Sequence, residues 1–265
     1  MSDFPIFKYF APKEPFIGIV SIPHSGEFIP VEFKPFLTDD LKAIACDVDF
    51  KVDELVDIEK LNEAGIAVIV STIHRTCVDL NRPENKAVLN WKSNSHGEKL
   101  VVAEPDTQLR SLLESKYHIP YFEMLKTMIL ELQKKAKKPV SFIDLHSMPS
   151  KPTEYHLKVT PDQPLIRPDF CVSDIEGISC TKNYINSVCK ELETFSSNVT
   201  QNIPYYGGHI TRFIHKTYSD INNIQIEISR GIYMDEQKKE LIGELVEPLK
   251  ENLTNSLVKF FRSNQ

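Results

Sequence analysis

The stretch FIGIVSIPHSGE, residues 16–27, joins an apolar run to a polar turn. Residues 16–22 are almost continuously apolar and rich in β-branched side chains, which is typical of a buried parallel strand. His24 and Glu27 follow at once, with Gly26 between them. The stretch therefore predicts a strand whose carboxyl end carries two groups able to bind a metal ion, or else an ordinary loop that holds a histidine and a glutamate.

Similar runs recur along the chain. Three more predict strands: residues 66–72, 140–145 and 223–229. Three segments have helical periodicity: residues 47–63, 120–138 and 235–261. Strands that alternate with helices predict an α/β fold, a three-layer sandwich around a mostly parallel or mixed central sheet. No repeat or low-complexity linker divides the chain, so we expect a single domain over residues 1–265.

Composition excludes several classes of protein. Charged residues make up 26% and hydrophobic residues 41% of the 265 residues, which is typical of a globular protein. The formal charge of −6 argues against a nucleic-acid partner. The longest apolar runs, such as residues 66–73, are too short to cross a bilayer, so no membrane partner is expected.

Two further features favour a cytoplasmic location. The opening residues, MSDFPIFKYFAPKEP, lack the basic start and the continuous apolar stretch of a signal peptide. The five cysteines form no C-x-x-C pair and are odd in number, which fits reduced thiols better than a disulfide framework.

Ionisable groups follow each predicted strand. Ligands of α/β proteins gather outside the carboxyl ends of the strands. The side chains found there are His24 and Glu27, then Arg75 with Asn81 and Arg82, then His146, and finally Glu227. Apolar strands that all end in such groups are hard to explain by packing alone, so these residues predict a polar site.

The residue types fit metal-dependent hydrolysis. A catalytic zinc ion commonly takes two histidines and one glutamate and leaves a position open for water. His24, Glu27 and His146 supply that set, although H-x-x-E by itself is weak and a histidine near a strand end is more often structural. Hydrolysis also needs a base and a group facing the oxyanion, which Glu227 and Arg75 could provide.

Five motifs together resemble the N-formylglutamate amidohydrolase family: PHSG at 23–26, DLNR at 79–82, DLHS at 144–147, GGHITR at 207–212 and IQIEISRGIY at 224–233. The resemblance implies a fold similar to zinc carboxypeptidases and aspartoacylase-like deacylases (phosphorylase/hydrolase-like). It implies one Zn²⁺ held by His24, Glu27 and His146, with Glu227 promoting the attack of water. Ligand sets of this kind also accept Co²⁺ or Ni²⁺.

The resemblance further implies hydrolysis of N-formyl-L-glutamate to formate and L-glutamate, as in histidine degradation. The partner would then be a small anionic acylated amino acid, whose carboxylates suit arginine. By analogy Arg82, with Asn81, holds the α-carboxylate, while Arg75 polarises the formyl carbonyl. Arg212 is the candidate for the side-chain carboxylate. His209 is either a ligand contact or a capped loop residue.

Several residues keep a second interpretation. Arg75 and Arg82 could be surface partners of Asp79 and Glu84. The strand with Glu227 could be an edge strand whose polar face is wet, whereas a central strand would bury the carboxylate and require a partner for it.

The acidic residues and one long segment also stay open. The cluster at 47–57 predicts a solvated helical face, or else Asp49 or Asp53 orients a ligand histidine. Asp144 should point to the same side of its strand as His146 and could do the same. Residues 89–106 form either a lid or a wall of the pocket.

Three functions fit these observations. The first is a zinc-dependent amidohydrolase that releases formate from an N-formyl amino acid. The second keeps the metal chemistry but acts on another N-acyl amino acid or on a peptide, as a deacylase or carboxypeptidase-like enzyme. The third is an inactive relative that binds a small anionic ligand. The sequence does not determine the oligomeric state.

Overall fold

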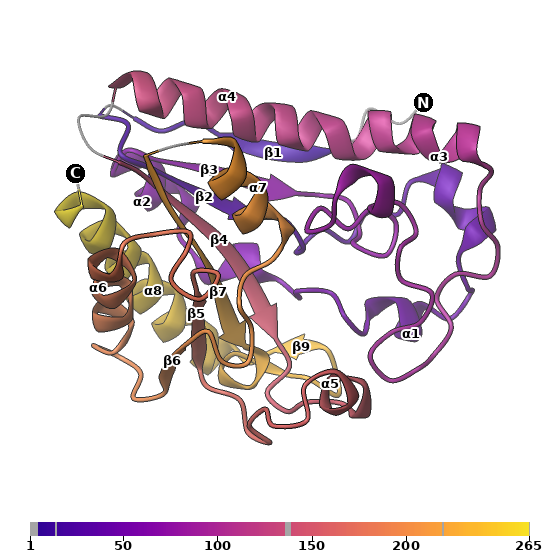
Figure 1. Ribbon diagram of the computed structural model, residues 1–265. Coiled ribbons are helices and arrows are strands. Elements are labelled where there is room, and N and C mark those ends of the chain that lie inside the picture. Colours follow the sequence, from indigo (N-terminus) through magenta and orange to yellow (C-terminus); the bar gives the residue numbers. More distant parts are fainter. Residues whose placement is uncertain (1–4, 14, 136–138, 219, 265) are drawn as a thin grey trace.

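A mixed seven-stranded sheet forms the centre of the computed structural model, which describes residues 5–13, 15–135, 139–218 and 220–264 (Figure 1). The strand order is β1-β3-β2-β4-β7-β5-β6. The strands are β1 (Phe7–Phe10), β2 (Gly18–Ile22), β3 (Ile66–Ser71), β4 (Val140–Met148), β5 (Phe170–Ser173), β6 (Val199–Gln201) and β7 (Ile221–Ser229). A small hairpin, β8 (Met234–Asp235) and β9 (Glu240–Leu241), follows. The predicted α/β sandwich is confirmed.

Helices cover both faces of the sheet. They are α1 (Leu41–Ala45), α2 (Ile58–Glu63), α3 (Thr107–Leu113), α4 (Ile119–Lys135), α5 (Glu154–Val159), α6 (Lys182–Leu192), α7 (His209–Thr217) and α8 (Gly243–Ser263). Short 3₁₀ segments lie at Val31–Phe36, Val52–Leu55, Glu84–Lys86 and Arg230–Ile232, and a π-helical turn at Glu114–His118 leads into α4.

The four central strands are parallel, and this arrangement gathers their carboxyl ends. Strands β3, β2, β4 and β7 pair in parallel, whereas β1 and β5 pair antiparallel with β3 and β7. In the β4–β7 register His146 lies opposite Glu227, and Asp144 lies opposite Gln225. Because partners in register point to the same face, these polar side chains lie side by side.

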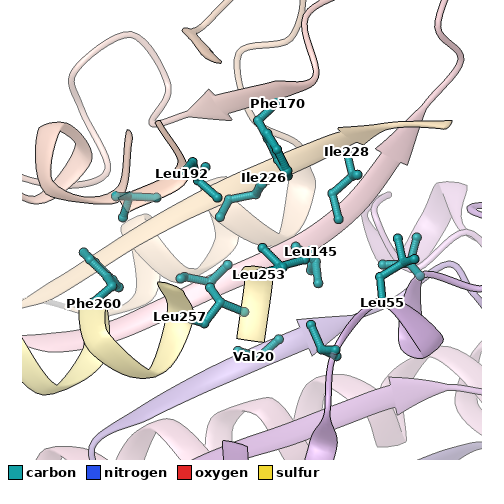
Figure 2. Packing of buried hydrophobic residues seen from close by; sticks show 14 of the residues in the cluster. Val20, Leu55, Leu145, Phe170, Leu192, Ile226, Ile228, Leu253, Leu257 and Phe260 are labelled. Carbon is teal, nitrogen blue, oxygen red and sulfur yellow. The ribbon is translucent and has the colours of Figure 1, made fainter. Parts of the chain in front are cut away.

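Each face of the sheet packs against its own helices. The isoleucines of β7 (Ile224, Ile226 and Ile228) pack in one cluster with Leu253 and Leu257 of α8 (Figure 2). On the opposite face, α4 and α7 cover the sheet with a second apolar cluster. The alternation in NIQIEIS therefore has the predicted effect: isoleucines face one layer, and Gln225 and Glu227 face the other.

Two predicted helices have wrong boundaries. Residues 47–63 form no continuous helix, because the 3₁₀ segment ends at Leu55 and Asp57 caps a new helix, α2, by accepting a hydrogen bond from the Lys60 amide. The predicted helix at 235–261 begins only at Gly243, since the hairpin β8–β9 takes up the residues before it. Residues 136–138, the end of the predicted helix at 120–138, lie outside the described residues.

In the described ranges, none of the helices combines the length and apolar character that a membrane span requires. The five cysteines are free thiols, in agreement with the absence of a C-x-x-C pair.

The packing of α8 leads to a stability prediction. The Leu253 side chain is fully buried between α8 and the sheet, so its truncation to alanine removes apolar contacts and leaves a cavity. We expect Leu253→Ala to lower the free energy of unfolding by about 2 to 5 kcal/mol, measured by urea denaturation followed by circular dichroism. Leu245→Ala on the same helix is the control, because that side chain is 39% exposed. Equal losses in the two variants would contradict this packing.

Candidate functional site

A cavity of about 1270 Å³ opens at the carboxyl ends of the parallel strands. Its wall contains eight residues that the sequence identifies as site candidates: His24, Arg75, Asn81, Arg82, His146, His209, Arg212 and Glu227. These residues come from segments that lie far apart in the sequence, from His24 to Glu227, and the sheet topology brings them together. Glu27, the ninth candidate, does not line this cavity.

Two histidines and one aspartate form a compact cluster in the wall. His24, Asp49 and His146 each offer a ligand atom, and these atoms lie within 4.8 Å of one another. All three side chains are buried. His146 Nδ1 lies 3.0 Å from Asp49 Oδ2, and His24 Nδ1 lies 3.7 Å from the same oxygen. Asp49 thus takes the position that the sequence assigned to Glu27.

Glu27 is excluded from this cluster by the path of the backbone. A Cβ atom on Gly26 would lie 2.3 Å from the Thr72 carbonyl carbon, so glycine permits a close approach to the neighbouring segment. The chain then runs beside that segment, and the Phe28 amide donates to the Thr72 carbonyl at 2.9 Å. Glu27 points to solvent, where its carboxylate pairs with Lys51 at 3.5 Å. The predicted set of His24, Glu27 and His146 is therefore not the set that the fold assembles.

Carboxylates hold both histidines in one orientation. His24 Nε2 lies 2.8 Å from Asp79 Oδ1, and His146 Nε2 lies 2.9 Å from Asp144 Oδ2. Ser21 Oγ in turn donates to Asp144 Oδ1 at 2.7 Å. In a neutral imidazole the ring nitrogen that faces a carboxylate carries the proton, which leaves the other as a ligand atom. For both histidines that other atom is Nδ1, on the side of Asp49.

The cluster fits a bound divalent metal ion. The Nδ1 atom of His24 is buried and has no hydrogen-bond partner among the described residues, which is costly for a polar atom unless a ligand occupies the position beside it. Two imidazole nitrogens and one carboxylate oxygen are ligand atoms that zinc accepts. Of the described residues, these three are the group whose donor atoms converge closely enough to hold a metal ion.

The ionisation of the cluster follows from its charges. Burial alone would raise the pKa of Asp49, but the neighbouring imidazoles of His146 and His24 and the nearby Arg75 charge hold it well below its usual range. Burial would lower the pKa of His146, yet Asp144 and Asp49 outweigh this and raise it well above the ordinary value. The surrounding carboxylates therefore favour a positive charge at this point.

Glu227 lies on an interior strand, because β7 is flanked by β4 and β5. The alternative of a wet edge strand is wrong, and the side chain is only 6% exposed. Its Oε1 atom accepts a hydrogen bond from Gln225 Nε2 at 2.6 Å. Burial raises the pKa of Glu227 to about 7, with the Asp49 charge adding to the rise and His146 and Arg75 opposing it. Such a carboxyl group can both accept and donate a proton near neutral pH.

Two arginines lie on Trp91 at the edge of the cluster. Arg75 and Arg82 place their guanidinium carbons 5.6 and 5.0 Å from the Trp91 ring centre. Both contact Asp79, at 3.5 and 3.6 Å, in agreement with the second interpretation, in which these arginines form ion pairs with Asp79. Asp79 is buried, however, so these contacts line the cavity instead of lying on an open surface. Burial disfavours the Arg75 charge, but Asp79 and Asp49 outweigh it and raise the Arg75 pKa.

The GGHITR segment closes one side of the cavity. A Cβ atom on Gly208 would lie 2.0 Å from Asn81 Nδ2, so only glycine fits at this approach. The Gly208 amide donates to Gln225 Oε1 at 2.7 Å, which connects the segment to Glu227. Asn81 Oδ1 accepts from the amide of Ile210 at 3.0 Å. The side chain of Asn81 thus fixes the first turn of α7.

His209 and Arg212 both lie in the first turn of α7, but they differ in exposure. His209 is half-buried, and burial together with the His118 charge lowers its pKa to about 4. Arg212 is exposed. Both line the cavity, so a ligand contact is open to each.

Residues 89–106 contribute a wall of the cavity. Trp91, Asn94 and Ser95 line it, and the Ser95 hydroxyl donates to Asp47 Oδ1 at 2.7 Å. Sequence reasoning missed Trp91, and it treated Asp79 only as an ion-pair partner although Asp79 lies within the DLNR motif. Asp53, a candidate for orienting a histidine, does not line the cavity.

Comparison with known proteins identifies similar chains. The model of the N-formylglutamate amidohydrolase family matches residues 18–234. A crystal structure of N-formylglutamate amidohydrolase from Ralstonia eutropha is similar with a TM-score of 0.84 and 23% identity, over 97% of each chain. A gene product from Agrobacterium tumefaciens is similar with a TM-score of 0.71 and 16% identity, over 96% of this chain and 95% of that one. Comparison with curated proteins gave no match.

The hydrogen bonds of Asp79 lead to a prediction. Its carboxylate accepts from Trp91 Nε1 at 2.6 Å and lies against His24 and Arg75. We expect Asp79→Ala to lower the free energy of unfolding by about 3 to 5 kcal/mol at pH 7, because it leaves buried donors without an acceptor. Urea denaturation measures the change. Asp162→Ala, at an exposed aspartate, is the control, and a similar small effect in both variants would contradict this role.

Proposed function

The chain belongs to the N-formylglutamate amidohydrolase family, and from this premise we propose that it is a metal-dependent hydrolase of N-formyl-L-glutamate. Water adds across the amide bond, which yields formate and L-glutamate. The observation that carries the proposal is the arrangement at the strand ends: a His24, Asp49 and His146 cluster lies in one cavity wall with the buried Glu227 and Arg75.

We propose that His24, Asp49 and His146 hold one Zn²⁺ ion. Support comes from the unpartnered Nδ1 atom of His24 and from Asp79 and Asp144, which orient the two rings. Zinc bound there would supply a Lewis acid toward water and the acyl carbonyl. Other divalent metals such as Co²⁺ fit the same ligand atoms.

Glu227 is the proposed proton-transfer residue. Its raised pKa, about 7, allows the carboxylate to take a proton from the attacking water and to return it to the leaving amine. Gln225 binds Oε1, so the orientation of the carboxyl group is fixed before the substrate arrives. Arg75 keeps its positive charge in the buried wall and would stabilise the negative charge that develops on the acyl oxygen when water attacks the acyl carbon.

Arg82 is proposed to bind the α-carboxylate. Its side chain is 43% exposed, so part of the guanidinium faces the opening of the cavity. Asn81 lies beside it and supports the loop at Gly208. His209 and Arg212 are proposed as further contacts at this rim. We expect the enzyme to act in the cytoplasm.

The volume of the cavity supports a second candidate function. About 1270 Å³ exceeds what a small formylated amino acid occupies, since pockets for ligands of drug size measure about 300 to 1,000 Å³. A deacylase or carboxypeptidase-like enzyme for a larger N-acyl amino acid or a peptide would use the same catalytic residues. A panel of N-acyl amino acids and C-terminal peptides, assayed beside N-formyl-L-glutamate, separates these substrates.

Formate release from N-formyl-L-glutamate tests the proposed function, with Glu227→Gln as the matched variant. We expect turnover by the unaltered protein and a fall in kcat of at least ~100-fold in Glu227→Gln, because glutamine cannot accept the proton. The zinc content should stay unchanged in the variant. No turnover of any substrate in the panel would indicate a binding protein, and near-normal kcat in Glu227→Gln would remove this residue from proton transfer.

The metal ligands make a separate prediction. We expect Asp49→Ala and His146→Ala to lose stoichiometric zinc, measured by mass spectrometry of the purified proteins after dialysis. Glu27→Ala should keep the wild-type zinc content, because the Glu27 carboxylate is exposed and pairs with Lys51. Loss of zinc from Glu27→Ala together with retention in Asp49→Ala would refute the ligand set proposed here.

A further inference from the structure

A buried arginine lies in the cavity wall apart from the metal cluster. Arg167 belongs to the segment between α5 and β5, and only 2% of its surface is exposed. The segment is anchored by its backbone, since the Arg167 amide donates to the Ser150 carbonyl at 3.0 Å. None of the motifs of the sequence includes Arg167, and the chemistry of the metal cluster does not use it.

The guanidinium of Arg167 is held by neutral acceptors. Its Nη1 atom donates to Tyr205 Oη at 3.0 Å and to the Pro149 carbonyl at 3.4 Å, and Nη2 donates to Gln163 Oε1 at 2.7 Å. The buried Nε atom has no partner among the described residues. A guanidinium has five N–H donors, so part of its donor capacity is unused.

Two other arginines of the cavity, Arg75 and Arg230, are paired with carboxylates. Arg75 contacts Asp49 and Asp79, and Arg230 contacts Asp49 at 3.5 Å. Within the described ranges, no carboxylate lies within ion-pair distance of Arg167. Removing a charge from water without an opposite charge is costly, so this arginine differs from its neighbours in needing an anion.

The groups around Arg167 do not supply that anion. Burial, and then the Arg167 charge, lower the pKa of His156 to about 4, so the imidazole is neutral at pH 7. Burial raises the pKa of Tyr205 to about 12 in spite of the Arg167 charge, so the phenol is neutral as well. Gln163 donates its amide group to the carbonyls of His156 and Thr160, which fixes its oxygen toward the arginine. Arg167 is therefore a pre-oriented cation.

We propose that Arg167 binds the side-chain carboxylate of the substrate and selects acidic N-acyl amino acids over neutral ones. This inference rests on the proposed function, and it names the residue that determines specificity within the same cavity. The chemistry is a charge-assisted hydrogen bond between guanidinium and carboxylate, which pairs the buried charge when the substrate is bound.

This assignment differs from the expectation for Arg212. Both arginines lack a carboxylate partner in the part of the chain that the structure describes, but Arg212 is exposed and Arg167 is buried. Water solvates an exposed guanidinium, so an unpaired Arg212 needs no ligand. A buried and unpaired guanidinium gains far more from an incoming carboxylate, because the surroundings screen the interaction less.

A purely structural role for Arg167 makes a different prediction. Its bonds to Pro149, Gln163 and Tyr205 tie together segments on either side of α5 and near β6. If that were its only role, loss of the guanidinium would disturb the cavity for all substrates alike. The ratio of kcat/KM for N-formyl-L-glutamate to that for N-formyl-L-glutamine separates the two roles, since the substrates differ only in the side-chain charge and donor pattern.

We expect Arg167→Gln to lower that ratio by at least ~10-fold, through a loss on the acidic substrate alone. Lys158→Gln is the matched control, because Lys158 is an exposed cation on α5 in the same wall, and we expect it to keep the wild-type ratio. Equal losses on both substrates, or an unchanged ratio in Arg167→Gln, would overturn the proposal.

Arg167→Lys covers the case in which Arg167→Gln does not fold, as judged by thermal unfolding. Lysine keeps the charge but not the planar fork, so we expect part of the preference for the acidic substrate to be lost. A wild-type ratio in Arg167→Lys, with Arg167→Gln unfolded, would overturn the proposal.

Binding of glutarate separates this proposal from the proposed function. The dicarboxylate should raise the Tm of the wild-type protein and of Lys158→Gln, and should raise that of Arg167→Gln less. If glutarate stabilises the proteins in this pattern but the wild-type protein releases no formate, the proposed function is refuted and the proposed carboxylate site at Arg167 is supported. Equal stabilisation of wild type and Arg167→Gln by glutarate would refute the site whether or not formate is released.

Discussion

The burial of the Asp49 carboxylate is the constraint on which the site depends. Its Oδ2 atom lies 3.0 Å from His146 Nδ1 and accepts from the Ser147 amide at 3.2 Å, while Arg75 and Arg230 contact Oδ1 at 3.4 and 3.5 Å. These partners come from the ends of β3, β4 and β7. A carboxylate buried in this way remains ionised only while its donors stay in place. The contacts of Asp49 therefore fix the segment before α2 against the carboxyl ends of the strands.

The same logic extends to the histidines. Asp79 and Asp144 each bind the Nε2 atom of one histidine, so with Asp49 three buried carboxylates surround two imidazoles. Negative charge at such density is stable only with positive charge at its centre, and the raised pKa of His146 is one expression of this demand. A divalent cation would balance the negative charge of the three carboxylates more fully, since it would also bind the Nδ1 atom of His24, which has no partner among the described residues.

Sequence reasoning succeeded where periodicity carries the information. The apolar runs located the four central strands, and the alternation in NIQIEIS placed Glu227 on the polar face. It failed for Glu27 because the spacing of H-x-x-E implies convergence only if the segment turns, and Gly26 instead lets the chain run extended beside Thr72. Asp49 was predicted only as a residue that could orient a ligand histidine, because residues 47–63 read as one helix with a solvated face. In the structure Asp49 lies outside any helix, before the 3₁₀ segment Val52–Leu55, and its side chain is buried.

Arg167 carries no such signal, because what distinguishes it is that no carboxylate of the described residues lies within ion-pair distance in space. The cavity divides into two electrostatic parts. Around Asp49 and Asp79, Arg75 and Arg230 are already paired with carboxylates of the protein before a carboxylate of the substrate arrives. An incoming dianion gains most where the wall is positive and unpaired. That distribution supports the two proposals: the reacting amide at the paired part of the wall, and recognition of the side-chain carboxylate at Arg167.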